Sequence, residues 1–315
     1  MQLVPIALTA PDGGMAQVLL WVILPIVLTI AVGFAFERAR PVEPRTLSQV
    51  SIYVLGPCLV FYSLLTTQLT RREFAGIGTF LVVLTAAMWI IGKAWTRMRH
   101  MDSAEEASFL LSTLFMNAGN YGIPLSLYAF GERAVDRAVV WVLVQNAILT
   151  PLAVYYAARE ESGRFEAVKT VFKMPVVYAA ALAALLRAVR VVPPDYVITP
   201  IHSLGLAMIP VAQLLLGVQL SRTAAYIKAD AHRITQACIL RLVVAPALGW
   251  CIADVLGLQG ITARVVVLLS ATPTAVNSSI LAIEFGAQPR FVSGCVFCST
   301  VASFGTLAVL LRLLG

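Results

Sequence analysis

The sequence is poor in charge. Asp, Glu, Lys and Arg make up 12% of its 315 residues, and 59% are hydrophobic, whereas an average soluble domain is roughly 25% charged. Because so few charged side chains cannot cover a surface that faces water, a soluble globular protein is excluded, and we predict a polytopic membrane protein. The net charge of +7 then belongs to loops that orient the chain, and we expect no nucleic-acid partner.

The sequence also lacks the usual signatures of a catalytic or metal centre. Its five cysteines all fall in apolar runs, and Cys295-x-x-Cys298 has no second Cys/His pair to complete a zinc site. There is no His-Glu-x-x-His motif, no paired intramembrane Asp and no Ser with a plausible His partner. We therefore predict that the protein is not an enzyme, with no catalytic residue, no metal site and no cofactor.

Apolar runs of membrane length are abundant. Each holds about 20 residues, enough to cross a bilayer as a helix, and each is bounded by a charged or Pro/Gly turn. The first is expected to be a retained span, because residues 1–14 hold no Lys or Arg and so lack the positive start of a signal peptide. The ten runs are 15–36, 47–68, 74–96, 107–129, 136–157, 170–190, 199–220, 234–255, 261–285 and 290–313.

The basic residues predict the orientation of these spans. When loops are assigned alternately to two sides, most Lys and Arg fall on one side, Arg241 and Arg290 among them. The positive-inside rule places that side in the cytoplasm. Arg241 is expected at the interfacial end of the span 234–255. We predict a multi-pass protein of the inner or plasma membrane with both termini outside the cytoplasm.

Landmarks recur between the two halves of the chain. Phe130-Gly131 and Phe285-Gly286 end the fourth and ninth spans, and Pro57 and Pro210 hold similar places in the second and seventh. These offsets predict a first five-helix repeat at 1–157 and a second at 158–315. Because five is an odd number, the second copy enters the membrane from the opposite side, which makes an inverted repeat.

Two of the spans are interrupted by polar, Pro- and Gly-containing stretches. These are Asn117-Ala-Gly-Asn-Tyr-Gly-Ile-Pro124 and Thr272-Pro-Thr-Ala-Val-Asn-Ser-Ser279. Pro removes a backbone N–H and breaks the helical bonding, and an unpaired peptide group in hydrocarbon is tolerated only where it is buried in protein or lines a wet cavity. Two such breaks at matching positions predict a pair of crossed broken helices that form a transporter's substrate site.

The chemistry of the breaks favours an anion. After each break a half-helix starts inside the membrane, and its free N–H groups and dipole are positive. The membrane core of these two spans holds no Lys or Arg, so we predict a neutral anion site with no fixed cation. The predicted substrate-binding residues are Asn117, Asn120, Tyr121, Gly122, Pro124, Thr272, Pro273, Asn277 and Ser278, with Gln213 facing them from the seventh span.

Other interpretations of these polar residues and breaks stay open. Glu284, Gln145 and Asn146 are candidates for ion coupling, but an interfacial acid and amides that join helices explain them as well. Pro and Gly could also kink the two spans for packing alone. Coupling to Na⁺ or H⁺ is an alternative to uncoupled transport, because freed carbonyls also suit a cation. A receptor that does not transport is a further alternative.

At these residues the chain resembles the auxin efflux carrier family, as a bacterial-type member. The resemblance rests on Asn117–Leu125 with Phe130-Gly131, on Pro273–Asn277 through Ala282–Gly286, and on Ser299-Thr300. It implies an all-α fold like that of bile-acid symporters and sodium/proton antiporters. A scaffold would comprise 15–68 and 170–220, and a transport domain 74–157 and 234–313, with Asn117 and Asn277 lining the site.

The resemblance also implies a function. The protein would carry small organic anions, such as auxin-like carboxylates or dicarboxylates, by elevator-type alternating access. Its expected partners are that substrate, membrane lipids and, as a candidate assembly, a second copy in a homodimer.

Overall fold

The computed structural model describes residues 15–157, 175–223, 230–284 and 287–315. Within these ranges every regular element is helical, and the one β-type pairing is an isolated bridge. Among the described residues, six helical segments are long and apolar enough to cross a membrane: Ala16–Ala39, Pro44–Thr66, Arg71–Met98, Asp195–Arg222, Ala231–Val255 and Pro289–Leu314. The protein is therefore an all-helical membrane protein.

The first half of the chain contains the elements α1 (Met15–Val18), η1 (Leu19–Ile23), α2 (Leu24–Ala39), α3 (Pro44–Val50), η2 (Ser51–Leu55), α4 (Gly56–Thr66), α5 (Arg71–Met98), α6 (Ser103–Leu114), η3 (Ala118–Gly122), α7 (Ile123–Phe130) and α8 (Glu132–Ala157). The predicted span 107–129 thus holds two helical segments, since residues 115–117 separate the end of α6 from the start of η3. The central loop expected at Ala158–Lys169 and the landmark Phe285-Gly286 lie outside the described residues.

The second half contains α10 (Pro175–Ala188), α11 (Asp195–Thr223), α12 (Ala231–Ile239), η5 (Leu240–Val244), α13 (Ala245–Val255), α14 (Gly260–Ser270), α15 (Asn277–Glu284) and α16 (Pro289–Leu314). The predicted span 261–285 again holds two segments, α14 and α15, separated by six residues without helix. α10 and α14 are apolar but shorter than a full membrane span.

The four segments labelled η are π-helical turns, and a proline follows each. The residue before the proline donates its N–H to a carbonyl five positions back. Proline cannot donate, and its ring clashes with the carbonyl four residues back; a wider turn removes the clash without ending the helix. The bonds are Leu24–Leu19 before Pro25, Gly56–Ser51 before Pro57, Ile123–Ala118 before Pro124 and Ala245–Leu240 before Pro246.

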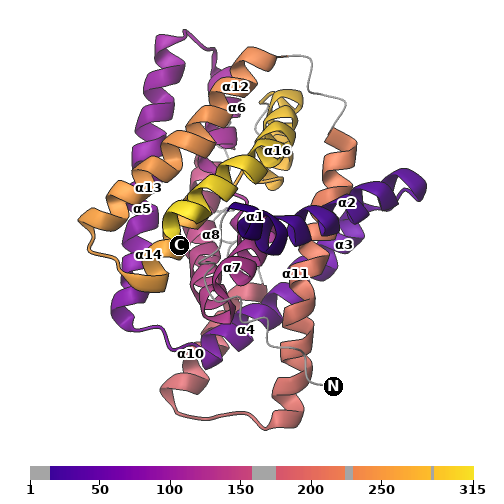
Figure 1. Ribbon diagram of the computed structural model, residues 1–315, viewed down its shortest axis with the longest axis vertical. Helices are drawn as coiled ribbons and strands as arrows, with labels where there is room; N and C mark the ends of the chain where they lie inside the picture. Colours follow the sequence, from indigo (N-terminus) through magenta and orange to yellow (C-terminus); the bar gives the residue numbers. More distant parts are fainter. Residues whose placement is uncertain (1–14, 158–174, 224–229, 285–286) are drawn as a thin grey trace.

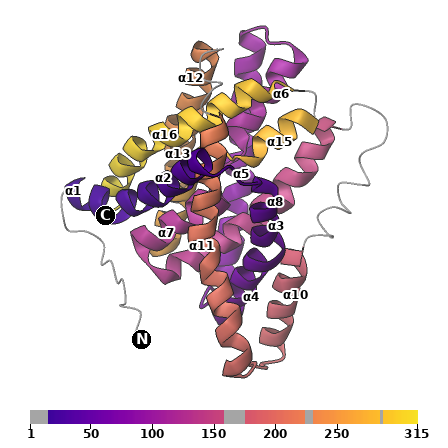
Figure 2. The ribbon, with the colours of Figure 1, turned by 90° about the vertical axis from the view of Figure 1, so that its right-hand side faces the viewer.

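The helices form two groups. α2 packs along α11, and α4 packs against both α10 and α11. In the other group α5 contacts α6 and α8, α14 contacts α8 and α13, and α16 contacts α12 and α15. Figure 1 shows α2, α3 and α11 on the right, α5 and α13 on the left, and α7 and α8 between them. Figure 2 shows α4 and α10 beside the lower half of α11.

Polar clusters join helix starts at two places in the second group. In one, Arg137 of α8 donates to Glu73 of α5 at 2.6 Å and to Thr262 of α14 at 2.9 Å. In the other, Arg233 of α12 donates to Glu105 of α6 at 2.6 Å and to Gln288, just before α16, at 3.1 Å. Each cluster therefore links the amino-terminal ends of three helices that are distant in sequence.

Candidate functional site

The two interruptions meet each other. Met116 and Thr274 form an isolated antiparallel bridge. The N–H of Asn117 donates to the Pro273 carbonyl at 2.9 Å, and the N–H of Ala275 donates to the Phe115 carbonyl at 2.8 Å. We call this paired region, residues 115–117 and 272–275, the crossing. Because helical bonding fails in both segments, each supplies the backbone partners that the other has lost.

Side chains also bond carbonyls at and just beyond the ends of α6 and α14. Thr274 Oγ1 donates to the Ser112 carbonyl at 2.7 Å, and Thr272 Oγ1 donates to the Leu269 carbonyl, also at 2.7 Å. Gln145 Nε2, from α8, donates to the Met116 carbonyl at 2.9 Å. The polar side chains around the crossing therefore stabilise non-helical backbone in a part of the molecule that excludes water.

Arg241 provides the largest share of this bonding. Its side chain is fully buried, and its guanidinium donates to the Thr113 carbonyl at 3.0 Å, to the Thr272 carbonyl at 2.9 Å and to the Ser270 carbonyl. Thr113 and Ser270 lie at the carboxyl-terminal ends of α6 and α14, where the helix dipole is negative. One cation thus compensates both helix ends and ties them together.

The expectation that Arg241 lies at the membrane interface is wrong, and so is the expectation of a crossing without a fixed cation. Arg241 lies in η5, roughly midway along the segment Ala231–Val255. A charged residue at mid-span is by default a functional candidate, so its position was the available signal. Without Arg241, the remaining Lys and Arg are still more numerous on the side predicted to be cytoplasmic.

Three predicted site residues have buried polar atoms without a hydrogen-bond partner in the described part of the chain. These atoms are Asn117 Nδ2, Ser278 Oγ and both amide atoms of Gln213. Asn117 is the last residue of the first segment of the crossing, and Ser278 lies in the first turn of α15. Gln213 lies on α11, which packs against η3. Beside Asn117, a Cβ added to Gly119 would meet no atom within 4 Å, so η3 adjoins open space.

Several other predicted site residues take part in packing. The Tyr121 hydroxyl accepts a hydrogen bond from Ser303 Oγ at 3.2 Å, and its ring is fully buried against α16. Gly122 lets the two broken segments approach, because a Cβ there would lie 2.5 Å from Leu269 Cδ2. Pro124 is buried in the first turn of α7. For these residues the structure shows a structural role.

The remaining candidates are more scattered. Gln145 accepts from Trp141 Nε1 at 2.8 Å while it donates to Met116, so its amide supports the crossing. Asn120 and Asn146 are half-buried, and Asn277 is exposed at the start of α15. Glu284 is the last residue of α15, away from the crossing in sequence.

Helices of membrane length around a polar, non-helical crossing define a membrane transport protein. Comparison with known proteins agrees: the family model described as "Membrane transport protein" matches residues 18–169 and 164–311. The chain belongs to this family, which is the auxin efflux carrier family that the sequence motifs resemble.

Two archaeal relatives carry the same general function in their names. An uncharacterized transporter of Methanothermobacter thermautotrophicus is 27% identical over 272 residues, which cover 84% of this chain and 87% of the relative. An uncharacterized transporter of Methanocaldococcus jannaschii is 20% identical over 299 residues, which cover 91% and 96% of the two chains. The family and these relatives are transporters and not enzymes.

Proposed function

We propose that the protein is a secondary transporter of small organic anions whose substrate carboxylate binds beside the crossing. The observation that carries this proposal is the set of unpartnered groups, Asn117 Nδ2, Ser278 Oγ and Gln213. Each can donate a hydrogen bond, and a buried donor without a partner costs about 1–3 kcal/mol. A bound carboxylate would supply the missing acceptors.

The electrostatics of the crossing also support a negatively charged substrate. Arg241 compensates the negative carboxyl-terminal ends of α6 and α14. The positive amino-terminal ends of the helical segments that follow, η3–α7 and α15, have no comparable buried acid among the polar and charged residues that the structure describes as buried. The local field therefore favours an anion.

The packing supports an elevator-type mechanism with inverted repeats. One polar cluster joins the starts of α5, α8 and α14, and the other joins the starts of α12, α16 and α6. In a 5+5 repeat the first cluster joins the third, fifth and ninth spans, and the second joins the eighth, tenth and fourth. The pseudo-two-fold axis would relate the third span to the eighth, the fifth to the tenth and the ninth to the fourth, so it would relate one cluster to the other. The segments α1 to α4 with α10 and α11 would be the scaffold, and α5 to α8 with α12 to α16 would move and carry the crossing.

Flux measurements test this function directly. The parent protein and the variants Asn117→Ala, Gln213→Ala and Ser278→Ala are reconstituted in liposomes and assayed with labelled indole-3-acetate, benzoate and succinate. We expect each variant to lose about tenfold or more in flux, because a hydrogen bond to a charged group is worth about 1.5–3 kcal/mol. Gln49→Ala, which removes an exposed amide on α3, is the matched control and should transport like the parent.

A parent protein that moves none of the three acids above empty liposomes, or three variants that equal it, would remove the crossing as a carboxylate site. The alternative of a receptor that does not transport predicts binding without flux.

Transport is also expected to be independent of sodium. Carbonyl oxygens freed by a broken helix can hold Na⁺, but here the Thr113, Ser270 and Thr272 carbonyls already bind the Arg241 guanidinium. Replacing sodium by choline on both sides of the liposome membrane should leave uptake unchanged. A rate that rises severalfold with an inward sodium gradient would support the coupled symporter instead.

A further inference from the structure

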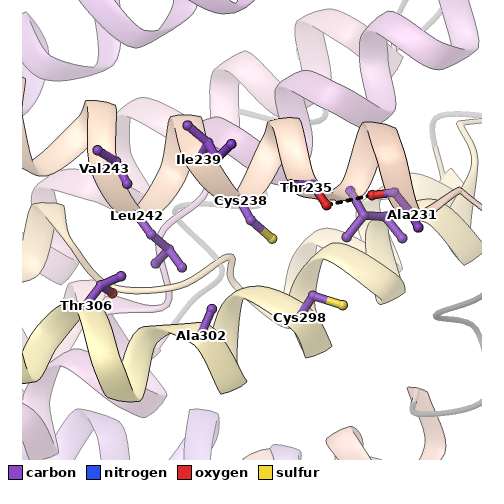
Figure 3. Close-up of a pocket in the computed structure, with 10 residues that line it drawn as sticks. Ala231, Thr235, Cys238, Ile239, Leu242, Val243, Cys298, Ala302 and Thr306 are labelled. Atoms are coloured by element: carbon purple, nitrogen blue, oxygen red, sulfur yellow. Dashed lines mark hydrogen bonds between the residues drawn. The ribbon is translucent and has the colours of Figure 1, made fainter.

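A groove lies between α12–η5 and α16 (Figure 3). Its volume is about 370 Å³. Small side chains line it on α16 at spacings of four residues, Cys298, Ala302 and Thr306, so they fall on one helix face. Cys238 and Leu242 face them from the opposite helix, and in Figure 3 both point towards α16.

The length of the groove is close to the thickness of the hydrocarbon layer of one membrane leaflet. It extends along the helix from Ala231 to Val243, which is roughly 18 Å at the rise of an α-helix. Half of a bilayer's hydrocarbon core is about 15 Å. Among its lining residues, Ile239 and Val243 have exposed apolar side chains, so the groove opens towards hydrocarbon.

A second hollow of about 470 Å³ adjoins the Ala231 end and shares Ile234 with the groove. Its polar lining residues are Asp230, Arg233, Gln288 and Arg290, and Ile234, Pro289 and Phe291 add an apolar part to its wall. Arg233 is already bonded to Asp230 and Glu105, so its charge is compensated. Arg290 is exposed in the first turn of α16, where the helix dipole is positive. Pro289 has no N–H, and the N–H of Gln288 already donates to Ser108 Oγ, so Arg290 is the main donor for an anion there.

We propose that the two hollows together bind one phospholipid, with its phosphodiester at Arg290 and the amino-terminal end of α16 and one acyl chain in the groove. The polar hollow alone would suit any small anion, and the groove alone any apolar chain. Their continuity selects a molecule that has both parts. The basic loops predicted on this side place the hollow in the cytoplasmic leaflet, where anionic lipids attract arginine.

Native mass spectrometry of the detergent-solubilised protein tests the site, with palmitoyl-oleoyl-phosphatidylglycerol as the probe. We expect the parent to retain one lipid, and palmitoyl-oleoyl-glycerol, which lacks the phosphate, to be retained poorly. Arg290→Gln should reduce retention of the phospholipid about tenfold, because a charge-assisted hydrogen bond is lost. Ala302→Phe should reduce it as much by filling the groove.

Matched controls separate the site from general lipid contact. Val301→Phe enlarges a neighbouring residue of α16 that is exposed but does not line the groove, and Arg45→Gln removes another exposed arginine. Both should retain lipid like the parent. Three results would each overturn the proposal: Arg290→Gln and Ala302→Phe retain the phospholipid as well as the parent does, the two controls lose it as much as these variants are expected to, or the parent retains palmitoyl-oleoyl-glycerol as well as the phospholipid.

Discussion

Replacing Arg241 by methionine is expected to destabilise the protein and to abolish transport. Methionine fills a similar space but donates no hydrogen bond, so the Thr113, Ser270 and Thr272 carbonyls lose their partner in a buried region. Each unsatisfied acceptor costs about 1–3 kcal/mol, which predicts a loss on the order of 3 kcal/mol or more. Unfolding in mixed micelles, followed by tryptophan fluorescence, measures it.

Amide hydrogen exchange shows whether the loss of stability is local to the crossing. In Arg241→Met we expect faster exchange of the N–H groups of Asn117 and Ala275, which hold the two segments together. Arg241→Lys keeps the charge but cannot bridge three carbonyls with one compact ammonium group, so it should recover part of the protection. Arg97→Met removes an exposed arginine and should change stability by less than about 0.5 kcal/mol.

If Arg241→Met unfolds like the parent and its crossing keeps the same exchange protection, the arginine does not hold the two broken segments together. A variant that is stable and protected but no longer transports would instead assign Arg241 a direct contact with the substrate.

Replacing Gly217 by alanine is expected to have the second-largest effect. α2 and α11 cross in direct backbone contact: a Cβ on Gly217 would lie 2.0 Å from the Ile30 carbonyl oxygen, and one on Gly33 would lie 2.2 Å from the Leu214 carbonyl oxygen. Since backbone atoms cannot swing aside as a side chain can, the two helices must separate. Overpacking of this kind costs about 1–3 kcal/mol, and thermal unfolding should shift down accordingly.

Gly305→Ala is the control for this substitution. Gly305 is also a glycine in a long helix, but a Cβ there would meet no atom within 4 Å. Alanine is the better helix former by about 1 kcal/mol, so Gly305→Ala should be neutral or slightly stabilising. A Gly217→Ala protein that melts at the parent's temperature would show that α2 and α11 can separate without cost.

The positions of the interruptions could be predicted from the sequence, because they depend on local backbone chemistry. Pro124 and Pro273 lack an N–H, and the neighbouring Gly and Asn residues tolerate backbone that is not helical. The structure ends α6 at Leu114 and α14 at Ser270, within a few residues of the predicted breaks. Pro25, Pro57 and Pro246 follow π-turns as Pro124 does, but of these four only Pro124 has a non-helical stretch before its π-turn, and the sequence pattern did not distinguish these outcomes.

The site could be predicted only in part. Asn117, Ser278 and Gln213 were candidates, and the structure leaves polar atoms of all three unpartnered in its described part. Tyr121 was a candidate of equal rank, yet its hydroxyl bonds to Ser303, 182 residues away in sequence. Which polar groups are used by packing and which stay free depends on helix rotation and on distant neighbours, and residue spacing does not encode these.

The sequence by itself determined that this chain lies in a membrane, is helical, belongs to a transporter family and breaks its helices at two places. Those properties follow from composition, from the length of apolar runs and from residues that cannot sustain helical bonding. Only the tertiary structure decided how the breaks are stabilised. Arg241 is distant in sequence from Thr113 and less so from Ser270 and Thr272, and it reaches all three carbonyls because packing brings α6, η5 and α14 together.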